Sequence, residues 1–359
     1  MRAWAIVAGA LLLLVVLWDA FETIVLPRRV TRRLRLARLF YRATWVSFRK
    51  LARLRRPGAA RENFLSVYGP LSLLLLLGLW AAGLVVGFAL LHWGLGTRLQ
   101  LPPGMGGFAA SLYFSGTTLF TIGLGDVAAK SEIGRFLTVL EGGTGLGFLA
   151  LVIGYLPILS QAFSRREVNI SLLDARAGSP PTAAELLRRH AHPDSGEGLA
   201  QLLVEWERWS ADLLETHISF PVLAFYRSQH ENQSWVAALT TVLDVCALII
   251  AGVEHGPLRT ARLTYAMARH AVADLSRVFY QPPKPPNPDR LPLEELGKLR
   301  QALDAAGHAL PAKKGVDEKL TRIRQTYEPY VNALAEFLLM PLPRWVPPER
   351  LKDNWERTL

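Results

Sequence analysis

The chain has 359 residues, of which half are hydrophobic, and its mean hydropathy is +0.19. A soluble protein of this length usually has a negative mean hydropathy, so this composition argues against a wholly soluble protein. The formal net charge is +11, but twelve Arg and Lys and no acid lie between Pro27 and Pro57, so the other residues sum to −1. A single basic block beside an apolar segment predicts a membrane topology signal and contact with anionic lipid, and we expect no nucleic-acid partner.

The one cysteine, Cys246, excludes an intramolecular disulfide and a multi-cysteine zinc site, and we expect it to be a small buried side chain. The sequence contains no serine-histidine-acid set with motif support and no phosphate-binding loop. We therefore expect neither an enzyme nor a resident cofactor.

The first predicted element is a membrane helix over about Ala3–Leu26, in a first domain of residues 1–27. A retained helix is favoured over a signal peptide because no small-x-small cleavage site follows it and a dense basic run does. Its last turns carry Asp19 and Glu22, which we expect to lie at the interface. By the positive-inside rule the basic run stays in the cytoplasm and the N-terminus lies outside.

The basic segment, residues 28–66, is predicted to be a cytoplasmic or interfacial linker. Within Arg28–Arg56 the apolar residues recur at near-helical spacing, at Val30, Leu34, Leu36, Leu39, Phe40, Val46, Phe48, Leu51 and Leu54. Two interpretations stay open: an amphipathic helix that lies on lipid headgroups, or a helix packed on the cytoplasmic domain.

Two further membrane helices are predicted on either side of a short apolar segment. The second helix, about Val67–Trp93, runs outward and places His92 and Trp93 at the outer interface. The third, about Ile133–Phe163, runs inward and is expected to end at Arg165 and Arg166. Between them lie a turn-rich extracellular loop, Gly94–Gly107, and a segment too short to span, Phe108–Phe120.

Residues 167–359 have a soluble composition and are predicted to form a cytoplasmic helical domain. The helical patterns are Thr182–His190, Leu199–Thr216, Leu258–Tyr280 and Leu293–Leu303, and the proline-rich segment Gln281–Pro288 is expected to break the region in two. The apolar segment Trp235–Val253 carries Asp244 at its centre, which favours a buried core helix over a fourth span. The histidines from His190 onward show no metal-ligand spacing, and we expect surface or capping roles for them.

The chemically informative segment is Thr118–Asp126, of sequence TLFTIGLGD. A pore that selects cations replaces the water of the ion with rings of backbone carbonyls from four chains. Consecutive carbonyls then point to one side, which requires alternating unusual dihedral angles, and Gly123 and Gly125 permit these. Thr121 adds a hydroxyl ring at the inner end, and Asp126 adds a carboxylate ring at the outer mouth.

This segment resembles the potassium-channel signature Thr-Val-Gly-Tyr-Gly-Asp, and the order of outer helix, pore helix, filter and inner helix resembles that family over about Val67–Phe163. Gly134-Arg135 and Gly145 also fall where such channels carry a Gly-Arg pair and a hinge glycine. The resemblance implies an all-α membrane protein with a pore domain at residues 67–166, preceded by one extra membrane helix. It further implies a homotetramer, with potassium as the permeant ion held by the backbone of Thr121, Ile122, Gly123 and Leu124.

Two positions depart from the family pattern. Leu124 replaces the usual Tyr or Phe that braces the filter by hydrogen bonding, and Tyr113 and Phe114 of the pore helix are left as apolar packing partners. Phe120 replaces the first threonine of the common Thr-Thr pair. The leucine at position 124 favours the alternative of a less selective monovalent-cation channel.

The inner helix offers candidate gating residues. By alignment to the family Leu146, Leu149, Ile153 and Pro157 line the cavity, with Gly145 as a hinge and Pro157 as a kink near the gate; contacts between helices are the alternative for each. Gly142–Gly147 does not fit a nucleotide loop and indicates a closely packed helix.

Glu141 lies at membrane depth with no partner evident in the sequence. A hydrogen bond behind the filter to Thr117 or Thr118 is expected, as either a structural brace or a gating sensor.

The sequence thus predicts a potassium channel subunit of a bacterial inner (plasma) membrane, with the C-terminus in the cytoplasm. The alternatives are a weakly selective monovalent-cation channel and a non-conducting receptor or scaffold with a pore-like layout. No membrane segment carries regularly spaced arginines, so we do not expect voltage sensing. The gating stimulus and the ligand of the C-terminal domain are not identified.

Overall fold

The computed structural model describes residues 2–26, 35–191, 196–230, 232–347 and 353–354. The chain forms two compact units, each considered by itself. The N-terminal unit comprises residues 1–56 and 67–160, and the C-terminal unit comprises residues 57–66 and 161–359. Both are almost entirely helical, in agreement with the predicted all-α class.

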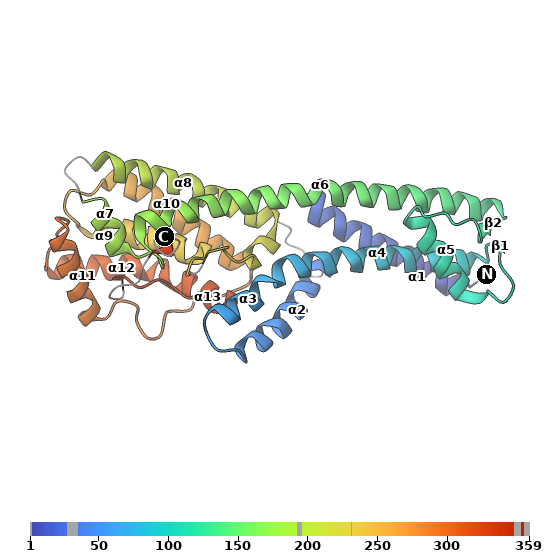
Figure 1. Cartoon of the computed structure of the whole chain (residues 1–359), viewed down its shortest axis with the longest axis horizontal. Coiled ribbons are helices and arrows are strands. Elements are labelled where there is room, and N and C mark those ends of the chain that lie inside the picture. Colours follow the sequence, from blue (N-terminus) through green and yellow to red (C-terminus); the bar gives the residue numbers. More distant parts are fainter. Residues whose placement is uncertain (1, 27–34, 192–195, 231, 348–352, 355–359) are drawn as a thin grey trace. The chain divides into compact units, whose positions relative to one another are not determined.

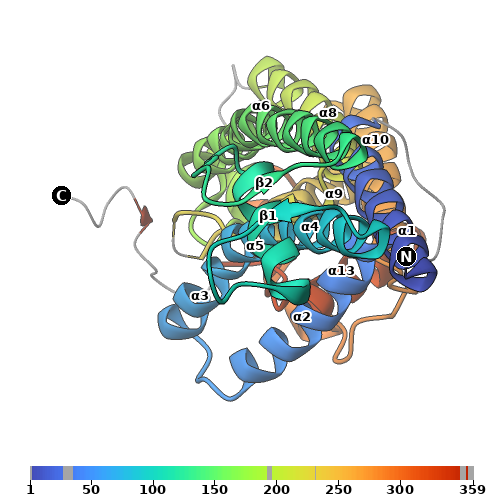
Figure 2. The same ribbon diagram turned by 90° about the vertical axis from the view of Figure 1, so that its right-hand side faces the viewer.

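In the N-terminal unit, α1 (Ala3–Ala20) lies along α4 (Tyr68–Leu95), as Figures 1 and 2 show. A π-helical turn, Phe21–Val25, extends α1. The two helices approach closely where Gly9 faces Gly87, since a Cβ built on Gly9 would lie 2.7 Å from the Gly87 carbonyl oxygen. Small residues of this kind let apolar helices pack without a bulky side chain between their backbones.

The acids near the end of this first helix are buried within the protein. Asp19 Oδ2 accepts hydrogen bonds from Trp80 Nε1 and from the Ala37 amide, each at 3.0 Å. Glu22 forms an ion pair with Arg35 at 3.3 Å. The partners of both carboxylates are thus protein groups, and the interfacial position of Asp19 and Glu22 stays a prediction.

The basic segment forms α2 (Leu36–Arg53), while Val30 and Leu34 of its predicted apolar pattern lie outside the described residues. The rings of Trp45 and Phe48 pack on Tyr68 at the start of α4, with centroids 4.8 and 5.0 Å from it. α2 belongs to the same compact unit as α4 and contacts it. Residues 57–66, assigned to the linker from the sequence, contain α3 (Ala59–Ser66) and group with the C-terminal unit.

The short helix α5 (Gly107–Leu119) follows α4 and packs against it. The antiparallel pair β1 (Leu99–Gln100) and β2 (Ala128–Ala129) joins the chain before α5 to the chain after the filter segment. The last element is α6 (Glu132–Ala177), which is continuous over 46 residues. The prediction that this helix ends at Arg165 and Arg166 is wrong, and the predicted domain boundary at residue 166 falls inside it.

Within the described ranges, three helical stretches are long and apolar enough to cross a membrane: Ala3–Val25, Ala59–Leu95 and Glu132–Ala177. They contain the three spans that the sequence predicts. α5 is too short to be a fourth.

The C-terminal unit is a helical bundle around α9 (Trp235–Ala251), in which every side chain but that of Ile250 is buried. The expected buried core helix is therefore confirmed. The surrounding helices are α7 (Ala183–Arg189), α8 (Gly196–Ser219), α10 (Leu258–Val278), α11 (Leu293–Ala305), α12 (Lys314–Gln325) and α13 (Glu328–Leu338), with a 3-10 turn at Pro221–Phe225.

A buried guanidinium, Arg166, fixes the second half of α6 inside the C-terminal unit. It donates to the carbonyls of Leu223 and Tyr226 at 2.8 and 2.9 Å and pairs with Glu167 at 2.8 Å. His217 Nε2 lies 3.3 Å from Arg166, and burial, together with that positive charge, lowers the pKa of His217 well below its usual value. His217 and His308 are both buried, so the expectation of surface or capping roles is wrong for these two.

Asp244, at the middle of α9, is neutralised by a buried ionic network. Arg290 contacts Asp244 at 2.6 Å and Glu328 at 3.0 Å, and the Tyr327 hydroxyl donates to Asp244 at 2.5 Å. Burial alone would lower the pKa of Arg290, but the charges of Asp244 and Glu328 raise it above its usual value. Arg290 lies two residues after the proline-rich segment and bonds to α9 before it, so that segment does not divide the unit, and the expected break there is wrong.

We expect Arg290→Met to destabilise the C-terminal unit by about 3–5 kcal/mol, because it leaves the buried Asp244 carboxylate without its cationic partner, whereas Glu328 keeps Arg324. The measurement is chemical denaturation of the purified protein. Lys298→Met is the control, because Lys298 is half-exposed on α11 and pairs only with surface acids. Equal denaturation midpoints for Arg290→Met and the wild type would contradict a stabilising role for the network.

Candidate functional site

The candidate filter segment, Thr118–Asp126, is hydrogen-bonded through its backbone amides to the C-terminal end of α5. The Thr121 amide donates to the Thr118 carbonyl at 3.0 Å. The amides of Ile122 and Gly123 both donate to the Thr117 carbonyl, at 2.8 and 3.3 Å. Thr117 and Thr118 therefore hold the first half of the segment through backbone groups.

Backbone dihedral angles alternate along this segment. The φ angles of Thr121, Gly123 and Gly125 are 55°, 58° and 78°, whereas no positive φ occurs at Ile122 or Leu124. A Cβ on either glycine would meet no atom within 4 Å in the chain, so conformation and not space requires glycine there. For a β-branched residue such as Thr121, a positive φ is strained and persists only where the surroundings impose it. This alternation is the one expected of a segment that turns its carbonyls to one side.

A second bond ties the far end of the segment back to α5. The Tyr113 hydroxyl donates to Asp126 Oδ2 at 2.9 Å, and Asp126 Oδ1 accepts from the Val127 amide at 3.1 Å. Tyr113 was expected to serve as apolar packing for Leu124, and its hydroxyl instead bonds to Asp126. The Leu124 side chain is 63 % exposed in the single chain, and Phe114 is buried against the His92 ring.

Glu141 is completely buried, and its partners come from two other helices. The Ser115 hydroxyl of α5 is bonded to Glu141 Oε1, and His92 Nε2 of α4 lies 3.3 Å from Glu141 Oε2. The expected partners Thr117 and Thr118 are therefore wrong. Ser115 and His92 were missed from the sequence because they lie 26 and 49 positions from Glu141.

A contact with Thr97 orients the His92 ring. The Thr97 hydroxyl donates to the His92 carbonyl at 3.1 Å, and its oxygen lies 3.2 Å from His92 Nδ1. The cluster of His92, Ser115 and Glu141 thus joins α4, α5 and α6.

Gly145 is the point where α6 touches the end of α5. A Cβ built on Gly145 would lie 1.8 Å from the Leu119 carbonyl oxygen, a distance no structure tolerates. This contact gives Gly145 a packing role in addition to the hinge role expected from the sequence. Gly142–Gly147 lies within α6, but within the chain only Gly145 of its glycines is closely packed, since a Cβ at Gly142, Gly143 or Gly147 would meet no atom within 4 Å.

The other gating candidates, Leu149, Ile153 and Pro157, lie on one exposed face of α6 together with Leu146. The helix continues without interruption through Pro157.

We expect Gly145→Ala to prevent the normal packing of α6 on α5, because the Leu119 carbonyl is rigid backbone. The variant should unfold at a lower temperature than the wild type and elute differently on size-exclusion chromatography. Gly154→Ala is the matched control, because a Cβ at Gly154 meets no atom within 4 Å. A fully stable, native-sized Gly145→Ala protein would show that the close approach is not required.

Replacing Glu141 separates the two roles left open for it. Glu141→Leu leaves His92 Nε2 without its carboxylate neighbour, whereas the Ser115 hydroxyl keeps its bond to the Val85 carbonyl, and it should cost about 1–3 kcal/mol, measured as a lower thermal midpoint. Glu141→Gln keeps a hydrogen-bonding group and should stay near wild-type stability. An unchanged pH response of ion flux in Glu141→Gln would identify a brace, whereas a lost response would identify a sensor.

Three apolar helices long enough to span a membrane, a half-length helix and a segment of alternating backbone handedness form an arrangement typical of pore-loop ion channels. In agreement, residues 75–160, from within α4 to α6, match a protein-family model described as "Ion channel". This part of the chain is therefore similar to an ion-channel domain.

The chain is also 25 % identical over 255 residues to a protein of Bacillus subtilis (strain 168) named "Uncharacterized membrane protein YdjJ". The alignment covers 68 % of this chain and 72 % of that protein, so the similarity extends well beyond the channel domain. No solved structure matches the chain.

Proposed function

We propose that the chain is one subunit of a homotetrameric channel that conducts potassium passively down its electrochemical gradient, through a filter formed by Thr121–Asp126. The observation that carries this proposal is the alternating φ at Thr121, Gly123 and Gly125, with the amides of the segment bonded back to α5. Because these amides point toward α5, the carbonyl groups of the segment can point to its opposite side. A dehydrated cation requires a row of carbonyl oxygens of this kind.

The proposed ion sites are formed by the backbone of Thr121, Ile122, Gly123 and Leu124. Because one chain supplies one filter strand, four copies are needed to close the ring. The apolar side chains of Phe120, Ile122 and Leu124 are each more than half exposed in the single chain, as are Leu146, Leu149 and Ile153 on α6. These surfaces fit contact with neighbouring subunits and with a central cavity.

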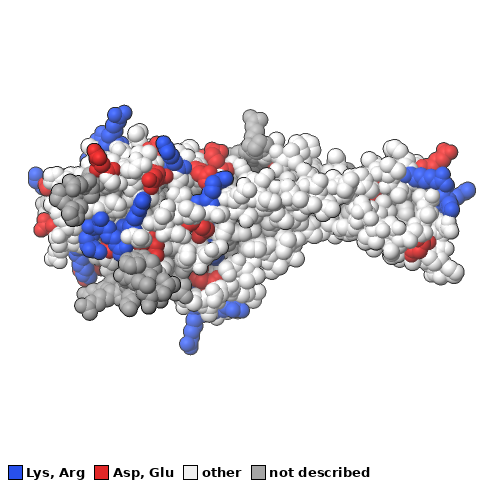
Figure 3. Space-filling model, turned by 45° about the horizontal axis from the view of Figure 1, so that its top comes forward, with Lys and Arg blue, Asp and Glu red and all other residues white. Residues whose placement is uncertain are grey.

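The proposed setting is a bacterial inner membrane. Figure 3 shows a broad face of the N-terminal unit without Lys, Arg, Asp or Glu beside a charged end, as expected of a surface in lipid. α2 carries basic residues and also exposes Leu39, Val46 and Leu51, which suits a helix lying among anionic headgroups. The positive-inside rule then places the C-terminal unit in the cytoplasm and the N-terminus outside.

A weakly selective monovalent-cation channel is the second candidate, and Leu124 favours it. A leucine side chain donates no hydrogen bond, so this position does not brace the filter as a tyrosine does. The bond between Tyr113 and Asp126 offers a brace at the outer end instead, which is why we place potassium selectivity first.

The test is the reversal potential of the purified protein in planar bilayers, with equal potassium and sodium on opposite sides. A potassium-selective pore should reverse far from zero, and in potassium gradients its reversal should shift by about 59 mV per tenfold change. Barium should block the current. A reversal near zero would reject potassium selectivity in favour of the second candidate, and no barium-sensitive flux from intact oligomers would indicate a non-conducting receptor or scaffold.

Tyr113→Phe gives a matched variant, because it removes only the hydroxyl that holds Asp126. We expect it to reduce selectivity while current persists. Equal selectivity in Tyr113→Phe and the wild type would show that the brace does not maintain the filter.

A further inference from the structure

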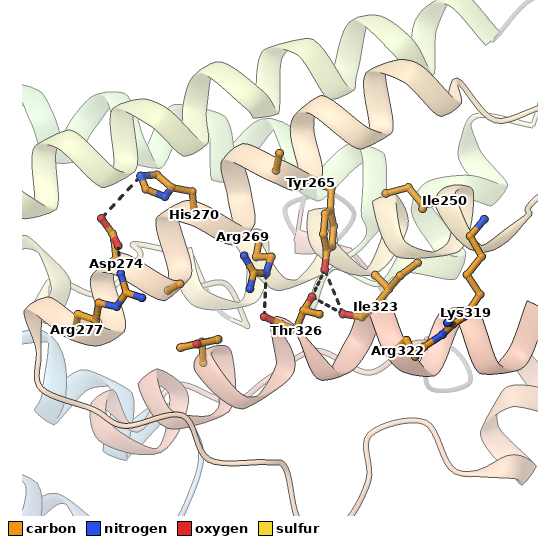
Figure 4. Close-up of a pocket in the computed structure, with 13 residues that line it drawn as sticks. Ile250, Tyr265, Arg269, His270, Asp274, Arg277, Lys319, Arg322, Ile323 and Thr326 are labelled. Carbon is orange, nitrogen blue, oxygen red and sulfur yellow. Dashed lines mark hydrogen bonds and ion pairs between the residues drawn. The ribbon is translucent and has the colours of Figure 1, made fainter.

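The C-terminal unit contains a cavity of about 790 Å³ that the channel function does not use. Figure 4 shows it between α10 on one side and α12 with the start of α13 on the other. Ile250, the one residue of α9 that is not buried, contributes to its lining. The volume is within the range of about 300–1,000 Å³ typical of small-molecule sites.

The lining is strongly basic. Arg269 and Arg277 come from α10, and Lys319 and Arg322 come from α12, against a single carboxylate, Asp274. The chain outside residues 27–57 has a slight net negative charge, so average composition does not explain this group of cations. Two basic residues on each wall favour an anion with charge at more than one point.

These cations form few ion pairs or hydrogen bonds with the protein itself. Arg277 pairs with Asp274 at 3.1 Å, whereas Lys319 and Arg322 form no ion pair with any residue the structure describes. The Nε of Arg269 donates to the Thr326 carbonyl at 3.2 Å, which fixes the guanidinium at the wall and keeps its terminal N–H groups for a ligand. A fixed guanidinium binds phosphate through two parallel hydrogen bonds at reduced entropic cost.

The remaining lining is apolar and aromatic. Tyr265 donates to the Ile323 carbonyl at 3.1 Å and is also bonded to Thr326, so its ring is held in place between α10 and α12 (Figure 4). Ile250, Ile323 and Tyr330 complete a surface suited to a flat ring. The cavity thus combines separated cations with a rigid apolar wall.

We propose that this cavity, the α10–α12 site, binds a small soluble molecule that carries two or more phosphate groups on a ring-bearing scaffold, of the nucleoside diphosphate class. The phosphates contact Arg269, Lys319 and Arg322, and the ring packs against Tyr265 and the isoleucines. The site is distinct from the filter, and its occupancy does not depend on ion flux.

The test is isothermal titration calorimetry on the purified full-length protein with ADP, pyrophosphate and adenosine as probes. We expect ADP to bind more tightly than pyrophosphate, and adenosine to bind weakest, with the affinity for ADP falling as salt is raised. Lys319→Ala combined with Arg322→Ala should weaken ADP binding at least tenfold, and Arg269→Gln should do the same. Arg262→Ala and Lys314→Ala are the controls, because they change exposed residues of α10 and α12 outside the cavity lining. They should leave the affinity for ADP unchanged.

A lipid headgroup also carries phosphate and could bind the same cations. Dihexanoyl-phosphatidylglycerol is therefore titrated in parallel. Binding of this lipid without ADP binding would overturn the nucleotide assignment, as would absence of binding by all probes. Equal loss of ADP binding in the control variants would also overturn it. Unchanged thermal midpoints in the lining variants would show that a lost affinity reflects the site and not unfolding.

Discussion

The filter segment depends on one backbone constraint: every second residue from Thr121 to Gly125 lies in the left-handed region. Such a strand has no regular partner for its hydrogen bonds, so neighbouring elements hold its conformation. The amides near its start donate to the end of α5, and Asp126 at its far end accepts from Tyr113. The position of α5 therefore determines the geometry of the filter.

α5 is in turn positioned by two contacts of opposite character. On one side, the missing side chain of Gly145 lets α6 touch the Leu119 carbonyl. On the other, Ser115 joins the buried cluster of Glu141 and His92. A close steric contact and a polar anchor thus add to the packing of α5 on α4.

Much of this arrangement could be predicted from the sequence. Hydropathy located the three helices long enough to span a membrane, and Asp244 distinguished a core helix from a fourth span. The Gly-x-Gly-Asp motif predicted the positive φ of Gly123 and Gly125, whereas their role in a filter stays a prediction. The pairing of Glu141 with His92 could not be predicted, because the two residues lie on different helices. In the sequence each of them is an isolated polar group in an apolar segment. The end of the third span was misplaced for a related reason: Arg166 resembles a membrane-flanking charge, yet it is buried among carbonyls of the C-terminal unit.

The burial of Cys246 has a practical consequence for spectroscopy. Its side chain is inaccessible within α9, and burial raises the pKa of its thiol, so the reactive thiolate is scarce at neutral pH. The natural sequence therefore provides a background that thiol-directed labels leave untouched. Fluorescent or spin labels can be attached to cysteines introduced on either unit, and distances between them followed in membranes without first removing the native residue.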